Sequence, residues 1–130
     1  GALPKLSLPS KMGIGAYLGD GSQYYPWIHI DDLCNMFIYA MENGLRGVYN
    51  ACAPGPVTNK HLSKTISYVL KRPFIPLPAP ALVLKLAMGE MSDMLLNSQR
   101  TSADKISAAG FKFTYPELEG ALKDIFRREV

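Results

Sequence analysis

The feature that most constrains the fold is the segment of residues 19–33, which reads GDGSQYYPWIHIDDL. A glycine turn leads into an aromatic and β-branched run that is typical of a strand, and the proline at position 26 restricts such a strand to an edge or a bend. Asp31 or Asp32 then caps a helix with regularly spaced apolar positions, which are Leu33, Phe37, Ala40 and Met41. The segment therefore predicts a strand over residues 24–30 that passes directly into a helix.

Short strands and helices are predicted to alternate along the rest of the chain. Apolar and β-branched runs predict further strands at residues 16–19, 47–53, 74–77 and 111–115. Capping signals and helical spacing predict helices at residues 58–71, 81–88, 104–109 and 116–128, with only a short or interrupted helix at residues 3–12. The expected buried stripes are Leu62, Ile66, Val69 and Leu70, and Leu118, Ala121, Leu122, Ile125 and Phe126. We therefore expect an α+β fold of short strands and about four or five helices.

The charge and cysteine content argue against several classes of protein. The net charge of +3 is too small, and the lysines and arginines are too scattered, to indicate a nucleic-acid partner. The longest apolar stretch, residues 79–88, is broken by Pro80 and Lys85 and is too short for a membrane span. Cys34 and Cys52 suggest neither a disulfide framework nor a metal site. We expect both to be reduced core thiols of a cytoplasmic protein.

The chain lacks the motifs that bind nucleotides or carry out common catalytic chemistry. No glycine fingerprint of a dinucleotide fold follows a strand, and none of the seven tyrosines has a lysine four residues further on. His29 and His61 are separated by a predicted helix, strand and loop, which argues against a metal pair. We therefore expect no catalytic residue, no metal site and no cofactor within residues 1–130.

Several motifs, in the same order along almost the whole chain, resemble the C-terminal part of extended short-chain dehydrogenases, the NAD-dependent epimerase/dehydratase family. GDGSQYYPWIHIDDL is similar to that family's glycine turn, aromatic strand and I-H-V-x-D-L junction. YNACAPGPVTN, KRP and GFKFTYPELEGAL continue the similarity. The chain most resembles a subgroup of uncharacterised epimerase-like proteins with a C-terminal domain of unknown function, some of which are named nucleoside-diphosphate-sugar epimerase or cell-division inhibitor.

The resemblance implies that residues 1–130 form the C-terminal substrate-binding domain of a longer protein and that the chain begins inside it. The Rossmann domain, with NAD or NADP, would lie outside this chain. The parent would be a nucleoside-diphosphate-sugar epimerase or oxidoreductase, and this portion would be inactive alone. The alternative is a non-catalytic binding or regulatory module on the same fold. A glycine motif and a Tyr-x-x-x-Lys pair in the parent gene would favour the enzyme.

Five residues are candidates for substrate binding, namely Gln23, Tyr25, Trp27, His29 and Arg100. By resemblance, Tyr25 stands where an arginine grips the diphosphate in sugar-nucleotide enzymes. A tyrosine offers one hydroxyl where arginine offers a charged fork of donors, so we expect a flatter and less charged ligand.

Each of these candidates also has a simpler structural explanation. Trp27 is equally a core side chain, and His29 can bond the backbone instead of a ligand. Gln23 can be a solvated turn residue, and an isolated Arg100 can face solvent. Asp31 and Asp32 can form an acid–base couple, but two carboxylates at a helix start more simply satisfy its free N–H groups.

The expected partners are the Rossmann domain and a small-molecule substrate, with neither nucleic acid nor a membrane. Leu3, Leu6, Leu8 and the helix at residues 81–88 are expected to leave apolar surface where the Rossmann domain would dock. Such a surface predicts that the isolated chain associates with itself.

Overall fold

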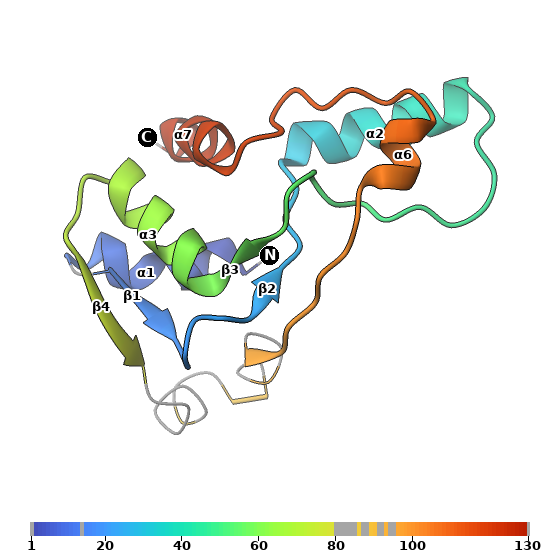
Figure 1. The fold of residues 1–130 in the computed structure, drawn as a ribbon. Helices are drawn as coiled ribbons and strands as arrows, with labels where there is room; N and C mark the ends of the chain where they lie inside the picture. The colour runs from blue at the N-terminus through green and yellow to red at the C-terminus, as the bar shows by residue number, and fades with distance from the viewer. Residues whose placement is uncertain are drawn as a thin grey trace.

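The computed structural model describes residues 2–13, 15–79, 86, 89–90, 93 and 96–129. The helices are α1 (Leu3–Lys11), α2 (Ile30–Glu42), α3 (Asn59–Val69), α6 (Asp104–Ala108) and α7 (Leu118–Arg128). The strands are β1 (Gly15–Leu18), β2 (Tyr24–Tyr25), β3 (Val57–Thr58) and β4 (Phe74–Ala79). This arrangement confirms the predicted α+β class, with short strands between helices (Figure 1).

The strands form two small sheets that lie beside α1 and α3. β1 pairs in parallel with β4, and β2 pairs antiparallel with β3, so that Tyr24 lies opposite Thr58. In Figure 1 α1 and α3 lie together with both sheets, whereas α2 and α6 form the other end of the molecule. Prolines at positions 76 and 78 are tolerated in β4 because the described sheet has only two strands.

Two apolar clusters stabilise these two ends. The first cluster lies between α3 and α7 and contains Leu62, Ile66, Leu118, Leu122 and Phe126. The second cluster contains Met36, Cys52, Ala103, Ile106 and Phe111 and joins α2 to α6 and the loops beside them. The predicted stripes of α3 and α7 are therefore confirmed as the sides that meet in the core. Thr58 caps α3 as predicted, since its hydroxyl accepts a hydrogen bond from the N–H of His61.

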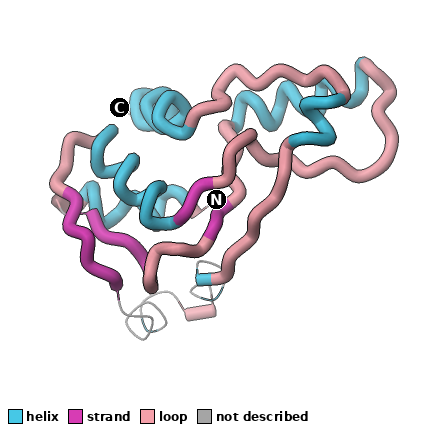
Figure 2. The backbone as a smooth tube through the Cα atoms, viewed as in Figure 1, coloured by secondary structure: helices cyan, strands magenta, loops and turns pink. Residues whose placement is uncertain are grey.

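Three predicted strands are shorter than expected or absent. The strand predicted over residues 24–30 pairs only at Tyr24 and Tyr25, because Pro26 has no N–H to donate. Residues 47–53 and 111–115 are loops (Figure 2). The backbone N–H groups of Thr114 and Tyr115 donate to the Asp32 carboxylate, and not to a neighbouring strand. A β-branched or alternating pattern forms a strand only where a partner backbone is available.

The start and the exposed side of α2 also differ from the prediction. His29, and not Asp31 or Asp32, is its N-cap. Only part of the predicted stripe is covered, because Leu33 and Ala40 are half-buried whereas Phe37 is 64% exposed and Met41 is 74% exposed. The buried side of α2 carries Asp32 and Met36 instead. Apolar spacing identified the helix correctly but did not identify which side is covered in this chain.

The remaining predictions are mostly confirmed. α1 continues through Pro9 without interruption but is short, and α6 ends before Gly110, whose φ of 99° is readily adopted by glycine. The helix predicted at residues 81–88 lies outside the described residues except for Leu86. Both cysteines are free, but Cys34 is exposed, so the prediction of a core position holds only for Cys52. Among the described residues, no helix has the length and apolarity needed to cross a membrane.

Candidate functional site

A mostly apolar hollow of about 550 Å³ opens beside β2 and the extended segment that follows it. Residues 24–30 form one wall, and α1 and α7 contribute Leu3, Leu6, Leu118 and Leu122. Asn97 and Gln99 complete the lining from the loop before α6. Three of the predicted site residues, Tyr25, Trp27 and His29, therefore lie in the wall that residues 24–30 form along the apolar hollow.

Tyr25 and Trp27 line the hollow and also pack in the hydrophobic core. Both pack against the cluster between α3 and α7 and also line the hollow. Burial raises the pKa of the Tyr25 hydroxyl, and hydrogen bonds with Gln23 and Asn59 act in the opposite direction. Among the described residues, the buried indole N–H of Trp27 has no hydrogen-bond partner. The two explanations for Trp27, core residue and pocket wall, are compatible.

Gln23 lies behind the wall and does not line the hollow. Its side chain is buried, and its amide nitrogen donates to the carbonyl of Leu18 at 3.2 Å. Its own carbonyl accepts from the N–H of Asn59 at 2.8 Å, while the Asn59 side chain accepts from the N–H of Leu18 at 2.6 Å. Gln23 therefore joins the ends of β1, β2 and α3 and is not a solvated turn residue.

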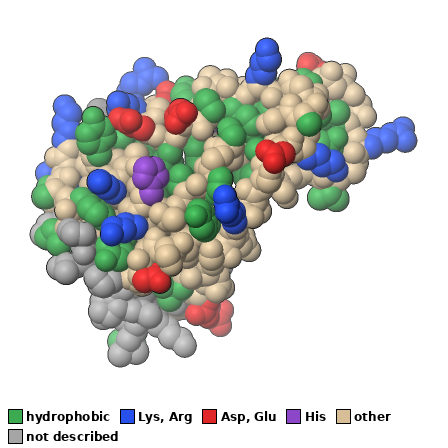
Figure 3. Space-filling view, in the orientation of Figure 1, with side chains coloured by type: hydrophobic (Ala, Val, Ile, Leu, Met, Phe, Trp, Pro, Cys, Tyr) green, Lys and Arg blue, Asp and Glu red, His purple; other side chains and the backbone are tan. Residues whose placement is uncertain are grey.

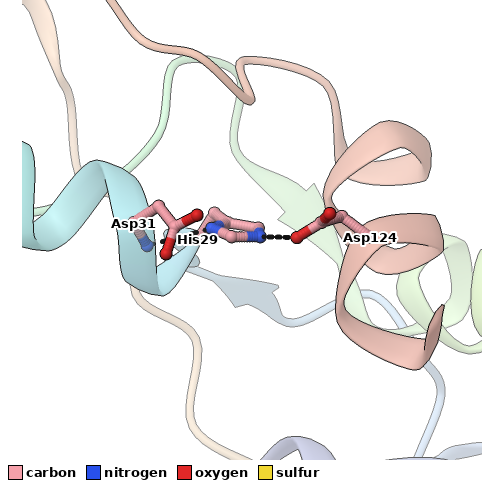
Figure 4. A group of neighbouring side chains, drawn as sticks. All are labelled: His29, Asp31 and Asp124. Atoms are coloured by element: carbon pink, nitrogen blue, oxygen red, sulfur yellow. Dashed lines mark hydrogen bonds and ion pairs between the residues drawn. The ribbon is translucent and has the colours of Figure 1, made fainter. Parts of the chain in front are cut away.

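His29 connects the wall to α7 (Figure 4). Its Nδ1 accepts a hydrogen bond from the N–H of Asp31 at 3.0 Å, and its Nε2 lies 2.8 Å from Oδ2 of Asp124. Because Nδ1 accepts, the ring proton belongs on Nε2, which donates to Asp124. The ring also stacks on Tyr115 with 3.9 Å between centroids. Both ring nitrogens are thus engaged within the protein.

Two arginines neutralise the carboxylates around His29. Arg127 donates to Asp124 at 2.8 Å, and Arg128 contacts both Asp124 and Asp31. The hydrogen bond from Arg127 is the main cause that lowers the pKa of Asp124, and the hydrogen bond from Arg128 is the main cause for Asp31. These contacts hold the start of α2 against α7.

The same group has the composition of a metal site but not its chemistry. Potential ligand atoms of His29, Asp31 and Asp124 lie within 4.8 Å of one another in the described part of the chain. Each of them already accepts from or donates to a protein group, and the arginines supply the positive charge that a cation would bring. Asp31 and Asp32 also have different partners, so they form no acid–base couple.

Arg100 does not line the apolar hollow, and two polar residues that sequence reasoning missed do line it. The Arg100 guanidinium lies 5.3 Å from the centroid of the Tyr24 ring. Asn97 and Gln99 reach the hollow because the Gln99 N–H donates to the Tyr24 carbonyl at 3.0 Å. No periodicity or capping signal marks residues 97–99, so only their pairing with β2 identifies them.

The described residues do not fit a nicotinamide dinucleotide. Such cofactors rest their pyrophosphate on a glycine-rich turn between a strand and a helix. Here the turn after β1 leads into β2, and its Gly21 packs against Tyr17 and Lys60. The described lining of the apolar hollow also contains no lysine or arginine.

In comparisons with known proteins, two segments of the chain match two different protein-family models. Residues 11–52 match the "NAD dependent epimerase/dehydratase family", and residues 79–125 match "Domain of unknown function (DUF1731)". The first segment includes the wall residues 24–30, and the second includes Asn97, Gln99 and Leu118. Both matched segments therefore contribute lining residues to the hollow, and Ala2, Leu3, Leu6 and Leu62 line it from outside them.

Several relatives are similar over nearly the whole chain. The epimerase family protein YfhF of Bacillus subtilis is 44% identical over 96% of this chain and 41% of its own length. A crystal structure of human epimerase family protein SDR39U1 with NADPH superposes with a TM-score of 0.86 at 38% identity, covering 98% of this chain and 43% of that one. A nucleoside-diphosphate sugar epimerase from Corynebacterium glutamicum has a TM-score of 0.66 at 27% identity, over 94% of this chain and 22% of that protein. The chain thus spans about two fifths of the length of the curated relatives it matches.

Proposed function

This chain belongs to the NAD-dependent epimerase/dehydratase family, and from that premise we propose that it forms the substrate-side domain of an NAD(P)-dependent epimerase-like oxidoreductase. The whole of residues 1–130 would be that domain. The observation that carries the proposal is the apolar hollow, to which the epimerase-like segment and the DUF1731 segment both contribute lining residues. The NADPH in the similar human structure supports a dinucleotide in the longer protein.

In this proposal the cofactor and the catalytic groups come from the part of the protein outside this chain. The described residues offer no cradle for a dinucleotide, and the chain covers only two fifths of its relatives. The domain would thus be inactive alone and would depend on that remaining part as its partner. The free thiols of Cys34 and Cys52 are in keeping with a cytoplasmic location.

The substrate we propose is flatter and less charged than a sugar nucleotide. Tyr25 stands in the wall where the resemblance leads one to expect a diphosphate-binding arginine. Among the described residues that line the hollow there is no Lys, Arg, Asp or Glu. A diphosphate placed there would lose its hydration without gaining a cationic partner, which is unfavourable.

The test compares the full-length protein with this chain by thermal shift and calorimetry. We expect the full-length protein to bind NADPH or NADH, this chain to bind neither, and UDP-glucose to stabilise neither one. Tight binding of a nicotinamide dinucleotide by this chain alone would contradict the proposal that the cofactor site lies outside it. A clear preference of the full-length protein for UDP-sugars would contradict the proposed substrate class. A full-length protein that binds the dinucleotide but lacks the Tyr-x-x-x-Lys pair would favour the non-catalytic module.

A further inference from the structure

We propose that the DUF1731 segment determines specificity in the apolar hollow through two carboxamides, Asn97 and Gln99, which select an uncharged substrate with a hydrogen-bonding carbonyl or hydroxyl group. This inference rests on the proposed function and deepens it, because it assigns a role to a segment described only as a domain of unknown function. It also names residues outside the predicted site.

Backbone contacts hold residues 97–99 at the edge of the hollow. The Gln99 N–H donates to the Tyr24 carbonyl, and the Tyr24 N–H donates to the Ser98 hydroxyl, both at 3.0 Å. The Asn97 N–H donates to the carbonyl of Asp93 at 3.0 Å. The loop is therefore attached to β2 through the Gln99 main chain and the Ser98 hydroxyl, which leaves the side chains of Asn97 and Gln99 available on the lining.

The two carboxamides can still form hydrogen bonds with a ligand, whereas other polar groups of the wall are already bonded within the protein. His29 uses both ring nitrogens within the protein, and the Tyr25 hydroxyl bonds with Gln23 and Asn59. Asn97 and Gln99 are exposed at the rim of the hollow, and their side chains have no hydrogen-bond partner among the described residues. Both line the same hollow at sequence positions two residues apart.

The chemistry of a carboxamide indicates what these groups recognise. An amide offers two N–H donors and a carbonyl acceptor without carrying charge. It therefore matches a ketone, an alcohol or another amide, whereas a phosphate or carboxylate in an apolar site calls for arginine or lysine. The surrounding Leu, Ile and aromatic side chains favour an apolar body for the rest of the ligand.

The test uses a matched pair of probes on this chain, which has Trp27 as its single tryptophan. The probes are 2-acetylnaphthalene, which is neutral, and 2-naphthoate, which has a similar shape but is charged. Binding is measured by Trp27 fluorescence and by the side-chain amide resonances of ¹⁵N-labelled protein. We expect the ketone to bind at least tenfold more tightly than the carboxylate and to shift the resonances of Asn97 and Gln99.

Variants separate the role of the carboxamides from that of the hollow itself. Gln99→Met and Asn97→Leu keep much of the side-chain volume and should each weaken ketone binding by about three- to tenfold, the usual effect of one neutral hydrogen bond. Asn35→Leu, at an exposed amide on α2, is the matched control and should change nothing. All variants should retain the melting temperature of the unaltered chain.

The outcomes distinguish this inference from the proposed function. Binding to Trp27→Ala is followed by the amide resonances, because this variant contains no tryptophan. If Trp27→Ala abolishes ketone binding while Gln99→Met and Asn97→Leu bind normally, the hollow binds ligands but the carboxamides do not select them, and the inference is wrong. Equal affinity for the ketone and the carboxylate would likewise show that the carboxamides do not select the ligand. If neither probe perturbs Trp27, the hollow is not a ligand site, and the substrate-side role itself loses its support.

Discussion

His29 and Asp124 lie 95 positions apart in the sequence, yet Nε2 of the first is 2.8 Å from a carboxylate oxygen of the second. The contact joins the residue that caps α2 to the middle of α7 and is completely enclosed on the histidine side. The wall of the apolar hollow is thereby attached to the helix opposite it. The stability of this junction decides whether the hollow keeps its shape.

Replacement of His29 should destabilise the chain through the loss of two interactions, the helix cap and the bond to Asp124, which two variants can separate. His29→Ala removes both the helix cap and the bond to Asp124, so we expect the free energy of unfolding to fall by about 1–3 kcal/mol. His29→Asn can still cap α2 but cannot reach α7, so it should lose only part of that amount. Urea unfolding followed by circular dichroism measures both variants. Equal losses for the two would show that the cap contributes little.

Acid should weaken the junction between α2 and α7. The pKa values of Asp31 and Asp124 are lowered below the ordinary 3.8 by Arg128 and Arg127. Between the lowered values and 3.8 the unfolded chain binds more protons than the folded chain, so stability rises with pH there. The contribution is complete above about pH 4 and is lost as the pH falls through the lowered values. Urea unfolding between pH 2.5 and 7 should show this loss.

Arg128→Gln is the variant that tests the source of this pH dependence. Without the guanidinium, the pKa of Asp31 should return toward its ordinary value, and the acid-dependent part of the stability should shrink. Lys123→Gln, which removes an exposed i,i+4 partner of Glu119, is the control and should leave the pH profile nearly unchanged. A profile for Arg128→Gln identical to that of the unaltered chain would refute the assigned cause.

Gly15 should tolerate no side chain. A Cβ at this position of β1 would collide with the Ser67 hydroxyl oxygen and lie 2.8 Å from that of Ser10, and these two hydroxyls form a buried hydrogen bond with each other. We expect Gly15→Ala to cost roughly 1–3 kcal/mol of stability. Gly120→Ala, in the first turn of α7, is the control, because a Cβ there meets nothing within 4 Å, and it should leave the stability unchanged or raise it by up to about 0.5 kcal/mol. Thermal unfolding of the two variants gives the comparison.

The exposed side of α2 should make the isolated chain associate with itself. Phe37 and Met41 are 64% and 74% exposed and lie one helical turn apart. Of the expected docking residues that the structure describes, Leu3 and Leu6 are partly covered, whereas Leu8 and Leu86 are exposed. Phe37→Gln with Met41→Gln keeps the net charge and should lower the apparent mass in light scattering at high concentration. Tyr68→Gln, at an exposed position on α3, is the control. A purely monomeric unaltered chain would contradict the expectation.

The face of the molecule seen in Figure 3 carries acidic and basic side chains side by side among hydrophobic ones. This mixture is in keeping with the sequence argument that scattered charge indicates no nucleic-acid partner. The apolar side of α2 is therefore a better candidate for association than any block of charge on this face.

Helices were more predictable than strands in this chain, and the reason is physical. The stripes and caps of α3 and α7 depend on residues three and four positions apart, so local spacing is enough to find them. The strands expected at residues 47–53 and 111–115 needed a continuous partner backbone, and in the described chain the first segment makes one such bond, from the Ala53 N–H to the Trp27 carbonyl. Spacing also located α2 but did not reveal that the side bearing Phe37 stays uncovered.

Local patterns along the chain were sufficient to predict the helices, the turn before β2 and the grouping of Tyr25, Trp27 and His29 on one short segment. Such features depend on neighbours along the chain, and the same local motifs also indicated the family. Only the tertiary structure decided that His29 caps α2 and meets Asp124, that Gln23 is buried, and that Asn97 and Gln99 face the hollow. These contacts join residues up to 95 positions apart, and a hydrogen bond between distant side chains leaves no local pattern from which it can be read.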